Sequence, residues 1–353
     1  MVTGRSCVLN RSRSRAWALT LGLAASFATP ITVAAGKPDT LQLKTSSVDI
    51  TATPISSFDG SSSSPSAKLS WRGGLKLTSG SSYFGGFSGL AILDSGRSLL
   101  CVSDAGFWLT ARLSYDNGHI SGLGGGRVGP IQALKGRSLE RRRDRDAEAI
   151  SVVSSGGANA QLLIGFENNA RIGRFDLGPD GLSPPDSYLE LPKPLGALRN
   201  NHGIESVAYL GQGPLTGNVL AFAERLRDQS GNQLGWIFSG KRAREIRLLP
   251  IGNFDISDAT ALPDGGVLVL ERRFRWSEGI NIRIRRLSPI DLQDNRPIAG
   301  ETILEAGNGT VLDNMEGIAV HRSEAGETIV TLISDDNFNF FQSTILLQFA
   351  LAG

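Results

Sequence analysis

The sequence is poor in cysteine and histidine, and these shortages exclude several kinds of site. Two of its 353 residues are cysteines, and three are histidines, namely His119, His202 and His321. A histidine-rich zinc site is therefore not expected. Cys7 lies in a segment that we expect to be removed, so Cys101 would remain alone, without an internal disulfide. Cys101 lies in the apolar run Leu-Leu-Cys-Val, which favours a buried structural thiol over a nucleophile.

Long apolar runs are also missing after the first 35 residues, so no membrane helix is predicted. The first residues themselves have the pattern of a secretory signal. Arg11, Arg13 and Arg15 precede the apolar run AWALTLGLAASFA, and Val-Ala-Ala at positions 33–35 offers a cleavage site. We predict a signal peptide at residues 1–35, a flexible N-terminal segment at 36–66 and the folded domain at 67–353. The protein is expected to be exported, to the periplasm or the extracellular space.

A positive charge excess is not a property of the mature chain. The whole chain has 36 basic and 34 acidic residues, and the predicted signal peptide carries four of the arginines and no acid. The remaining 32 basic and 34 acidic residues give a net charge of −2. Nucleic acid is therefore not an expected partner. We expect a monomer that binds a small molecule.

Helical periodicity is scarce, whereas short apolar runs alternate with turns rich in glycine, of which the chain has 43. This pattern indicates an all-β fold. A unit recurs five times: a small or acidic head residue, an apolar strand, a turn, and a second apolar strand that ends on an acid. The heads follow one another at intervals of 53 to 60 residues. Such a period predicts a β-propeller of four-stranded antiparallel blades.

The number of predicted blades is five or six. Five copies of the unit are readable, and the region from about Leu41 to Gly86 could contribute to a sixth blade. The last unit lacks a fourth strand before the chain ends. The segment Ala67 to Leu77 is expected to complete that blade and close the ring.

Equivalent residues of successive blades form rings around a propeller axis, and here two rings of acids are predicted. The head ring contains Ser88, Glu148, Glu205, Asp258 and Glu316, and the tail ring contains Asp104, Glu167, Glu224, Glu271 and Asp335. Carboxylates that face one channel need a compensating cation or raised pKa values. Oxygen ligands suit a hard divalent cation, and Ca²⁺ is the cation that we expect.

Roles can be assigned to the ring residues on this basis. The predicted metal ligands are Asp104, Asp146, Glu148, Glu205, Asp258, Glu316 and Asp335. The predicted catalytic residues are His202, Glu167, Glu224, Glu271 and Arg272. Arg272 follows Glu271 directly and would bind a phosphate group beside the metal. Each acid also has a structural alternative, because acids at strand ends cap turns and pair with arginines of a neighbouring blade.

The order of these motifs resembles a known family. The segments GGFSGLAIL, CVSDAG, RDAEAI, GFENN, GIESVAYL, SDATALPDGGVLVLERRF, NMEGIAV and LISDDNF resemble exported bacterial proteins of the phytase-like group, described by an esterase-like activity of phytase. The resemblance covers about Ser70 to Ala350. Propeller phytases and gluconolactonase-type propellers are more distantly similar. The resemblance implies a propeller fold and a calcium-dependent phosphoesterase.

Three functions remain open from the sequence. The first is a metal-dependent hydrolase of phosphate or carboxylic esters. The second is a sugar-lactone hydrolase, whose strand heads are similar to NMEGIAV, and the third is a binding propeller of the cell envelope without catalysis. A serine hydrolase is disfavoured because GGFSGL lacks the Gly-x-Ser-x-Gly spacing, and no glycine-rich phosphate loop precedes a helix.

Overall fold

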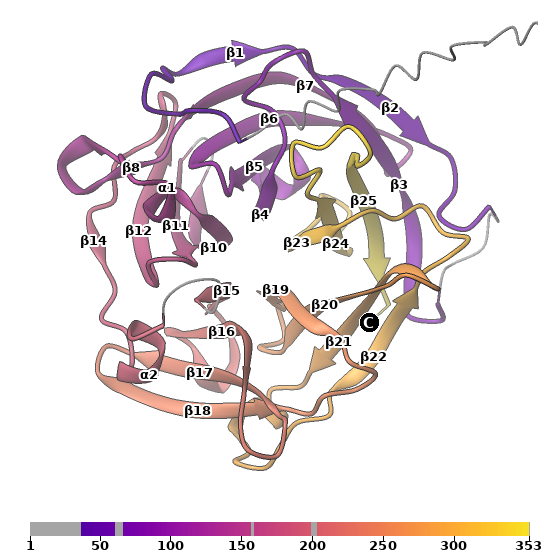
Figure 1. Ribbon diagram of the computed structural model, residues 1–353. Helices are drawn as coiled ribbons and strands as arrows, with labels where there is room; N and C mark the ends of the chain where they lie inside the picture. Colours follow the sequence, from indigo (N-terminus) through magenta and orange to yellow (C-terminus); the bar gives the residue numbers. More distant parts are fainter. Residues whose placement is uncertain (1–36, 61–65, 157–158, 199–202, 353) are drawn as a thin grey trace, which may run out of the picture. The chain divides into compact units, whose positions relative to one another are not determined.

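Five antiparallel sheets surround a central axis in a computed structural model that describes residues 37–60, 66–156, 159–198 and 203–352 (Figure 1). Their innermost strands are β4 (Phe87–Leu93), β10 (Ala147–Gly156), β15 (Ile204–Leu210), β19 (Asp255–Ala261) and β23 (Met315–Arg322). Each innermost strand contacts the next, and β23 contacts β4, so the ring is closed. The predicted all-β propeller is confirmed, and it has five blades.

Each blade continues outward from its innermost strand. Blade 1 adds β5 (Ser98–Ser103), β6 (Phe107–Asp116), β7 (His119–Pro130) and the edge strand β1 (Ser46–Val48). Blade 2 adds β11 (Asn159–Phe166), β12 (Arg171–Gly178), β13 (Gly181–Leu182) and β14 (Ser187–Tyr188). Blade 3 adds β16 (Asn218–Arg227), β17 (Gln233–Ser239) and β18 (Arg242–Leu248). Blade 4 adds β20 (Val267–Arg275), β21 (Gly279–Leu287) and β22 (Glu301–Ala306).

Blade 5 is built from both ends of the described chain. It contains β24 (Thr328–Ser334), β25 (Thr344–Leu351), β3 (Leu69–Thr78) and β2 (Thr51–Ile55). Strand β3 pairs antiparallel with β25, as expected for the segment from Ala67 to Leu77. The expected sixth blade from Leu41 to Gly86 is wrong, because β1 and β2 add to the edges of blades 1 and 5 instead. The sheets thus begin before residue 67.

Small elements connect the blades. A two-stranded sheet of β8 (Gln132–Ala133) and β9 (Arg137–Ser138) precedes the short helix α1 (Arg142–Arg145) between blades 1 and 2. A second short helix, α2 (Lys193–Gly196), lies between blades 2 and 3. Within the described ranges, the protein has no helix whose length and apolarity suit a membrane span.

The core lies between neighbouring blades. The second strand of each blade is buried on both faces, because it packs against an adjacent blade on either side, and its sequence is therefore an almost continuous apolar run. Cys101, in β5, is completely buried, and burial raises the pKa of its thiol. The predicted structural role of this thiol is thus supported by its position.

Candidate metal centre

A β-bulge interrupts the first two strands of every blade at the same place. In blade 2, Ala147 pairs with Phe166 and Ala149 pairs with Gly165, so Glu148 has no opposite residue. The other blades repeat this skip. The five bulged residues are Ser88, Glu148, Glu205, Ser257 and Glu316. A bulge turns its side chain out of the regular alternation of the strand. Here all five side chains line one axial cavity.

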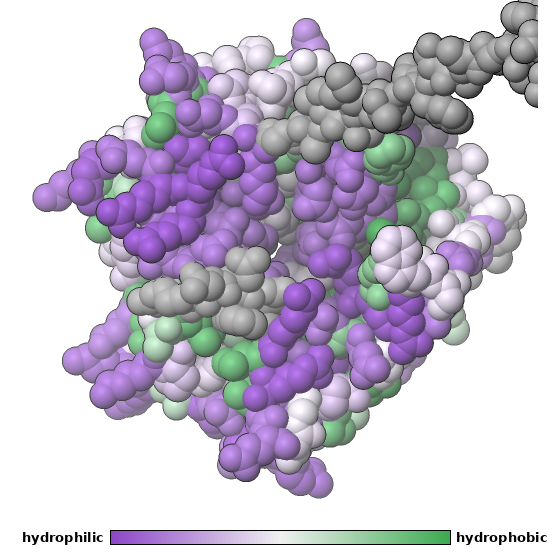
Figure 2. Space-filling model, viewed as in Figure 1, coloured by the Kyte–Doolittle hydropathy of each residue, from purple (hydrophilic) through white to green (hydrophobic). Residues whose placement is uncertain are grey.

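The ends of the second strands meet the bulges at the same face of the ring. The N–H groups of Asp104, Glu167 and Asp335 donate to backbone oxygens of Gly86, Asp146 and Asn314, over 3.1, 3.0 and 2.8 Å. Each acceptor stands two residues before a bulge. The resulting cavity has a volume of about 410 Å³, and hydrophilic side chains surround the hollow centre of this face (Figure 2).

In blade 4, the two residues at the ring positions of the cavity each precede or follow the predicted ring residue by one position. Its bulged residue is Ser257, because Ile256 pairs with Glu271 and Asp258 pairs with Leu270. The residue of β20 that corresponds to Asp104 and Glu167 is therefore Arg272. Both Ser257 and Arg272 line the cavity. Asp258 and Glu271, which also belong to the described residues, do not line it.

Asp258 instead joins two innermost strands. It is fully buried, and its carboxylate accepts hydrogen bonds from the N–H groups of Ala259 (2.8 Å) and of Ile318 in β23 (2.9 Å). Burial raises the pKa of Asp258 well above the ordinary value, although both N–H groups oppose the shift. These contacts favour a structural role over the predicted metal ligation.

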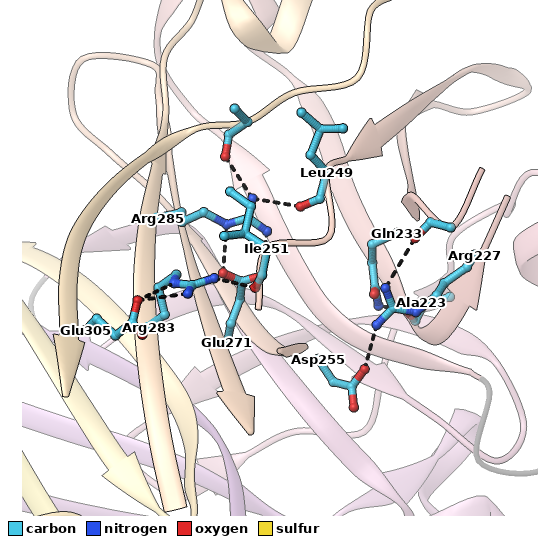
Figure 3. A network of polar contacts seen from close by, with 12 residues as sticks. Ala223, Arg227, Gln233, Leu249, Ile251, Asp255, Glu271, Arg283, Arg285 and Glu305 are labelled. Carbon is cyan, nitrogen blue, oxygen red and sulfur yellow. Dashed lines mark hydrogen bonds and ion pairs between the residues drawn. The ribbon is translucent and has the colours of Figure 1, made fainter. Parts of the chain in front are cut away.

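Glu271 has a buried arginine as its partner, so the geometry does not favour the predicted catalytic role. Arg285 holds both carboxylate oxygens, with Nε–Oε2 and Nη2–Oε1 distances of 2.7 and 2.5 Å (Figure 3). The two side chains are 2% and 1% exposed. Burial raises the pKa of Glu271, and Arg285 opposes that shift. The same guanidinium donates to the backbone oxygens of Leu249 and Ala299, which fastens β21 to the neighbouring loops.

The cavity carries an excess of negative charge. Its lining includes seven carboxylates, those of Asp104, Glu148, Glu167, Glu205, Asp255, Glu316 and Asp335, and three guanidinium groups, those of Arg225, Arg272 and Arg273. Arg272 pairs with Glu316 at 2.9 Å and Arg225 with Asp255 at 3.2 Å. The arginines lie on blades 3 and 4, so the negative excess falls on the remaining blades.

Burial and mutual repulsion shift the pKa values of these acids upward. Burial raises the pKa of Glu148 well above its ordinary value, and the charges of Asp146, Glu205 and Asp104 add to the shift. The pKa of Asp335 is raised well above its ordinary value, first by burial and then by Asp104. Burial also raises the pKa of Asp104, although Lys37 opposes this shift. A cation among these carboxylates would reverse such shifts.

Three carboxylates lie close enough to share a cation. Oxygens of Asp146, Glu148 and Glu167 lie within 4.8 Å of one another. Asp104 lies next to them, and its buried Oδ1 has no hydrogen-bond partner among the described residues. Such a set of oxygens fits a hard divalent cation such as Ca²⁺. Asp146, Glu148 and Glu167 would hold it, with Asp104 at the edge.

A lysine approaches the same carboxylates. The Lys37 Nζ lies 2.6 Å from Asp104 Oδ2 and 3.8 Å from Asp146 Oδ1. Burial lowers the pKa of Lys37, but the attraction of Asp104 outweighs it, and the pKa is raised overall. The ammonium group is therefore a counter-ion for the cluster. The sequence contains no pattern that would have identified Lys37.

Two predicted catalytic residues cannot be placed. His202 lies outside the described residues, and only the backbone of Glu224, in β16, is described. Sequence reasoning also missed Ser257, Asn253, Asp255 and Phe274 as lining residues. The register of the bulges is the signal that finds Ser257, and it appears only when the strands are paired.

Comparisons with known proteins identify a family for this chain. A family model described as "Phytase-like: Esterase-like activity of phytase" matches residues 82–338, more than half of the chain. No curated protein matches significantly. A solved structure titled "Structure of Dos1 propeller" is 11% identical, with a TM-score of 0.35 and coverage of 78% of this chain and 73% of that one. The match of the family model, over blades with one shared bulge, shows that the chain belongs to the phytase-like family.

Proposed function

We propose that this protein is a metal-dependent ester hydrolase that acts on phosphate esters, with Ca²⁺ as its cation. One observation carries the proposal: the same bulge in every blade turns a side chain into one cavity, where the excess of acids lies on blades 1, 2 and 5 and the arginines lie on blades 3 and 4. An acidic side suits a cation, and guanidinium groups suit the phosphate of a substrate. Turn chemistry alone does not require this convergence.

Each side of the cavity then has a distinct task. Asp146, Glu148 and Glu167 would hold the cation, which would supply Lewis-acid polarisation of the phosphate. Arg272, held by Glu316, orients the phosphate oxygens. Glu205, the bulged residue of blade 3, is our candidate for accepting the proton of the attacking water. The predicted catalytic residue Glu167 is thus reassigned to the metal, and Glu316 to positioning.

The proposed site suits an exported protein. We retain residues 1–35 as a signal peptide on the basis of the arginines, the apolar run and the cleavage site, and weak calcium sites are typical of extracellular proteins. Mass analysis of the secreted protein tests this proposal. An N-terminus at residue 36 is expected, and an intact N-terminus on secreted protein would contradict it.

Hydrolysis of phosphate esters is the direct test of the proposed function. We expect the purified protein to hydrolyse phosphate monoesters, to lose this activity in chelator, and to regain it when Ca²⁺ is restored. Phosphate release is the measurement, with carboxylic esters and sugar lactones assayed in parallel. Turnover of lactones alone would favour the gluconolactonase-type reaction, and no turnover in any class would favour a binding propeller.

The raised pKa values predict how the stability of the metal-free protein depends on pH. In the unfolded chain, Glu and Asp titrate near about 4.3 and 3.9. Above these values, folded Glu148 and Asp335 retain protons that the unfolded chain has lost, so stability falls as pH rises toward their folded pKa values. In chelator, we therefore expect Tm to fall as the pH rises above about 4.3 toward the raised folded-state pKa values.

Calcium should cancel this effect. A Ca²⁺ concentration about 100-fold above Kd should raise Tm at about pH 8 by roughly 5 °C. Differential scanning calorimetry with and without chelator measures both effects. A Tm that climbs with pH in chelator, or that ignores Ca²⁺, would refute the assignment of these acids to a cation site.

A further inference from the structure

An exposed aromatic pair continues directly from the cavity wall. Phe274 lines the cavity, and two residues further on Trp276 lies in the turn between β20 and β21. Phe274 is 54% exposed and Trp276 is 95% exposed. Their rings meet edge to face, with centroids 5.4 Å apart. Large apolar side chains so exposed contribute little to folding, and their position beside a polar cavity indicates a role in binding.

The alternation of β20 places this pair in line with the arginine at the cavity. Residues two apart in a strand point to the same side, so Arg272 and Phe274 share one face of β20, and the ring of Phe274 meets that of Trp276 in the following turn. Arg272 is the residue that replaces an acid in blade 4, and it pairs with Glu316. A ligand whose anionic group lies at Arg272 would therefore extend its other end along Phe274 toward Trp276.

The hairpin that carries the pair is fixed from both sides. Its ladder continues to the pair Arg275–Gly279. Arg273 and Arg275 bind the two carboxylate oxygens of Glu278 at 2.6 and 3.0 Å, and the Glu278 N–H donates to the Arg275 oxygen at 3.0 Å. Arg273 also lies over the ring of Phe254, 4.5 Å from its centroid. A platform held in this way loses little conformational freedom when a ligand binds.

We propose that Phe274 and Trp276 determine substrate specificity, and that the preferred substrate is a phosphate ester whose alcohol part carries a planar aromatic ring. This inference rests on the proposed function. The ring of the substrate packs against Phe274 and Trp276 while its phosphate lies at Arg272. Packing between two aromatic rings stabilises a complex by more than the burial of apolar area alone. A planar aromatic ring should therefore bind more tightly than a saturated ring of similar size.

Benzyl phosphate and cyclohexylmethyl phosphate form a matched pair for the test, because both release a primary alcohol of similar size. We expect kcat/KM for the benzyl ester to be roughly three- to tenfold higher. The contact is made before and during the reaction, so the difference should lie in KM rather than in kcat. Phe274→Leu and Trp276→Leu should each reduce the preference, and the double variant should remove it.

Phe340→Leu is the control, because Phe340 is 96% exposed in the loop between β24 and β25 and forms its own edge-to-face pair with Phe341. It should leave the preference unchanged. Equal kcat/KM values for the two esters, a preference that survives in the double variant, or one that disappears in Phe340→Leu would each overturn the inference.

Binding of phosphonates separates this inference from the proposed function. Benzylphosphonate and cyclohexylmethylphosphonate are not hydrolysed, and calorimetry measures their affinities directly. One outcome would contradict the proposed function and support the aromatic specificity. In that outcome no ester is hydrolysed, benzylphosphonate binds more tightly than cyclohexylmethylphosphonate, and the double variant loses this difference in affinity. If the two phosphonates bind equally well, the aromatic specificity fails whatever the hydrolysis shows.

Discussion

Replacing Glu148 by glutamine is expected to reduce Ca²⁺-dependent hydrolysis at least 100-fold. Glu148 is a bulged residue whose carboxylate lies within 4.8 Å of those of Asp146 and Glu167. Glutamine keeps the shape but removes the charge. Loss of a residue that only supports a metal ligand costs about 10- to 100-fold, and loss of a ligand should cost more. Phosphate release across a Ca²⁺ titration measures both the rate and the metal affinity.

The same variant should remain folded. Burial and neighbouring acids raise the pKa of Glu148, so its charged form is unfavourable when no cation is present. In chelator, the Tm of Glu148→Gln should therefore equal or exceed that of the natural chain at about pH 8. Glu190→Gln is a matched control, since Glu190 is 56% exposed, lies in the loop between β14 and α2, and does not line the cavity. Full Ca²⁺-dependent activity in Glu148→Gln would show that this cluster is not the metal site.

Replacing Arg285 by methionine is expected to destabilise the fold by about 3–5 kcal/mol, because it leaves Glu271 as a buried charge without its partner. The two side chains are almost completely buried, and both carboxylate oxygens of Glu271 are bound by Arg285. Urea unfolding followed by fluorescence measures the loss. The folded fraction should retain its Ca²⁺-dependent activity, because neither residue lines the cavity.

A double variant and a neighbouring arginine make this prediction specific. Glu271→Leu combined with Arg285→Met removes both charges and should recover most of the lost stability. Arg286→Met breaks an exposed pair with Asp264 and should cost less than about 1 kcal/mol. Loss of activity in Glu271→Gln without a change in stability would support the catalytic role predicted for Glu271.

The sequence was informative about the fold because a propeller repeats. The heads recur every 53 to 60 residues, and the second strands are apolar throughout, so blade order and strand pairs could be predicted. The closure of the ring by β3 followed from the missing fourth strand of the last unit. Blade number was left open because β1 and β2, which add to edges, have no repeat to mark them.

The rings of acids were less predictable, because a displacement of one residue reverses the direction of a side chain. Asp258 and Glu271 are acids next to Ser257 and Arg272 in the sequence. Because most other ring positions hold acids, the sequence alone favours Asp258 and Glu271 as the ring residues. The backbone pairing selects the serine and the arginine instead. Lys37 could not be found at all, since it approaches Asp104 across 67 residues of chain and has no counterpart in any repeat.

The pairing of β3 with β25 also has a consequence for the order of folding. Thr344 lies opposite Leu77, so two strands near opposite ends of the described chain must meet before the ring can close. Loop closure over such a distance is slow, and until it occurs β3 presents an unpaired edge. Blades 2 to 4 can form earlier from consecutive strands, so the last rate-limiting event should be the arrival of β25. Aggregation during refolding is therefore expected to start at blade 5. Among the described residues, the other blades consist of strands that are consecutive in the sequence, except that the short strand β1 adds to the edge of blade 1.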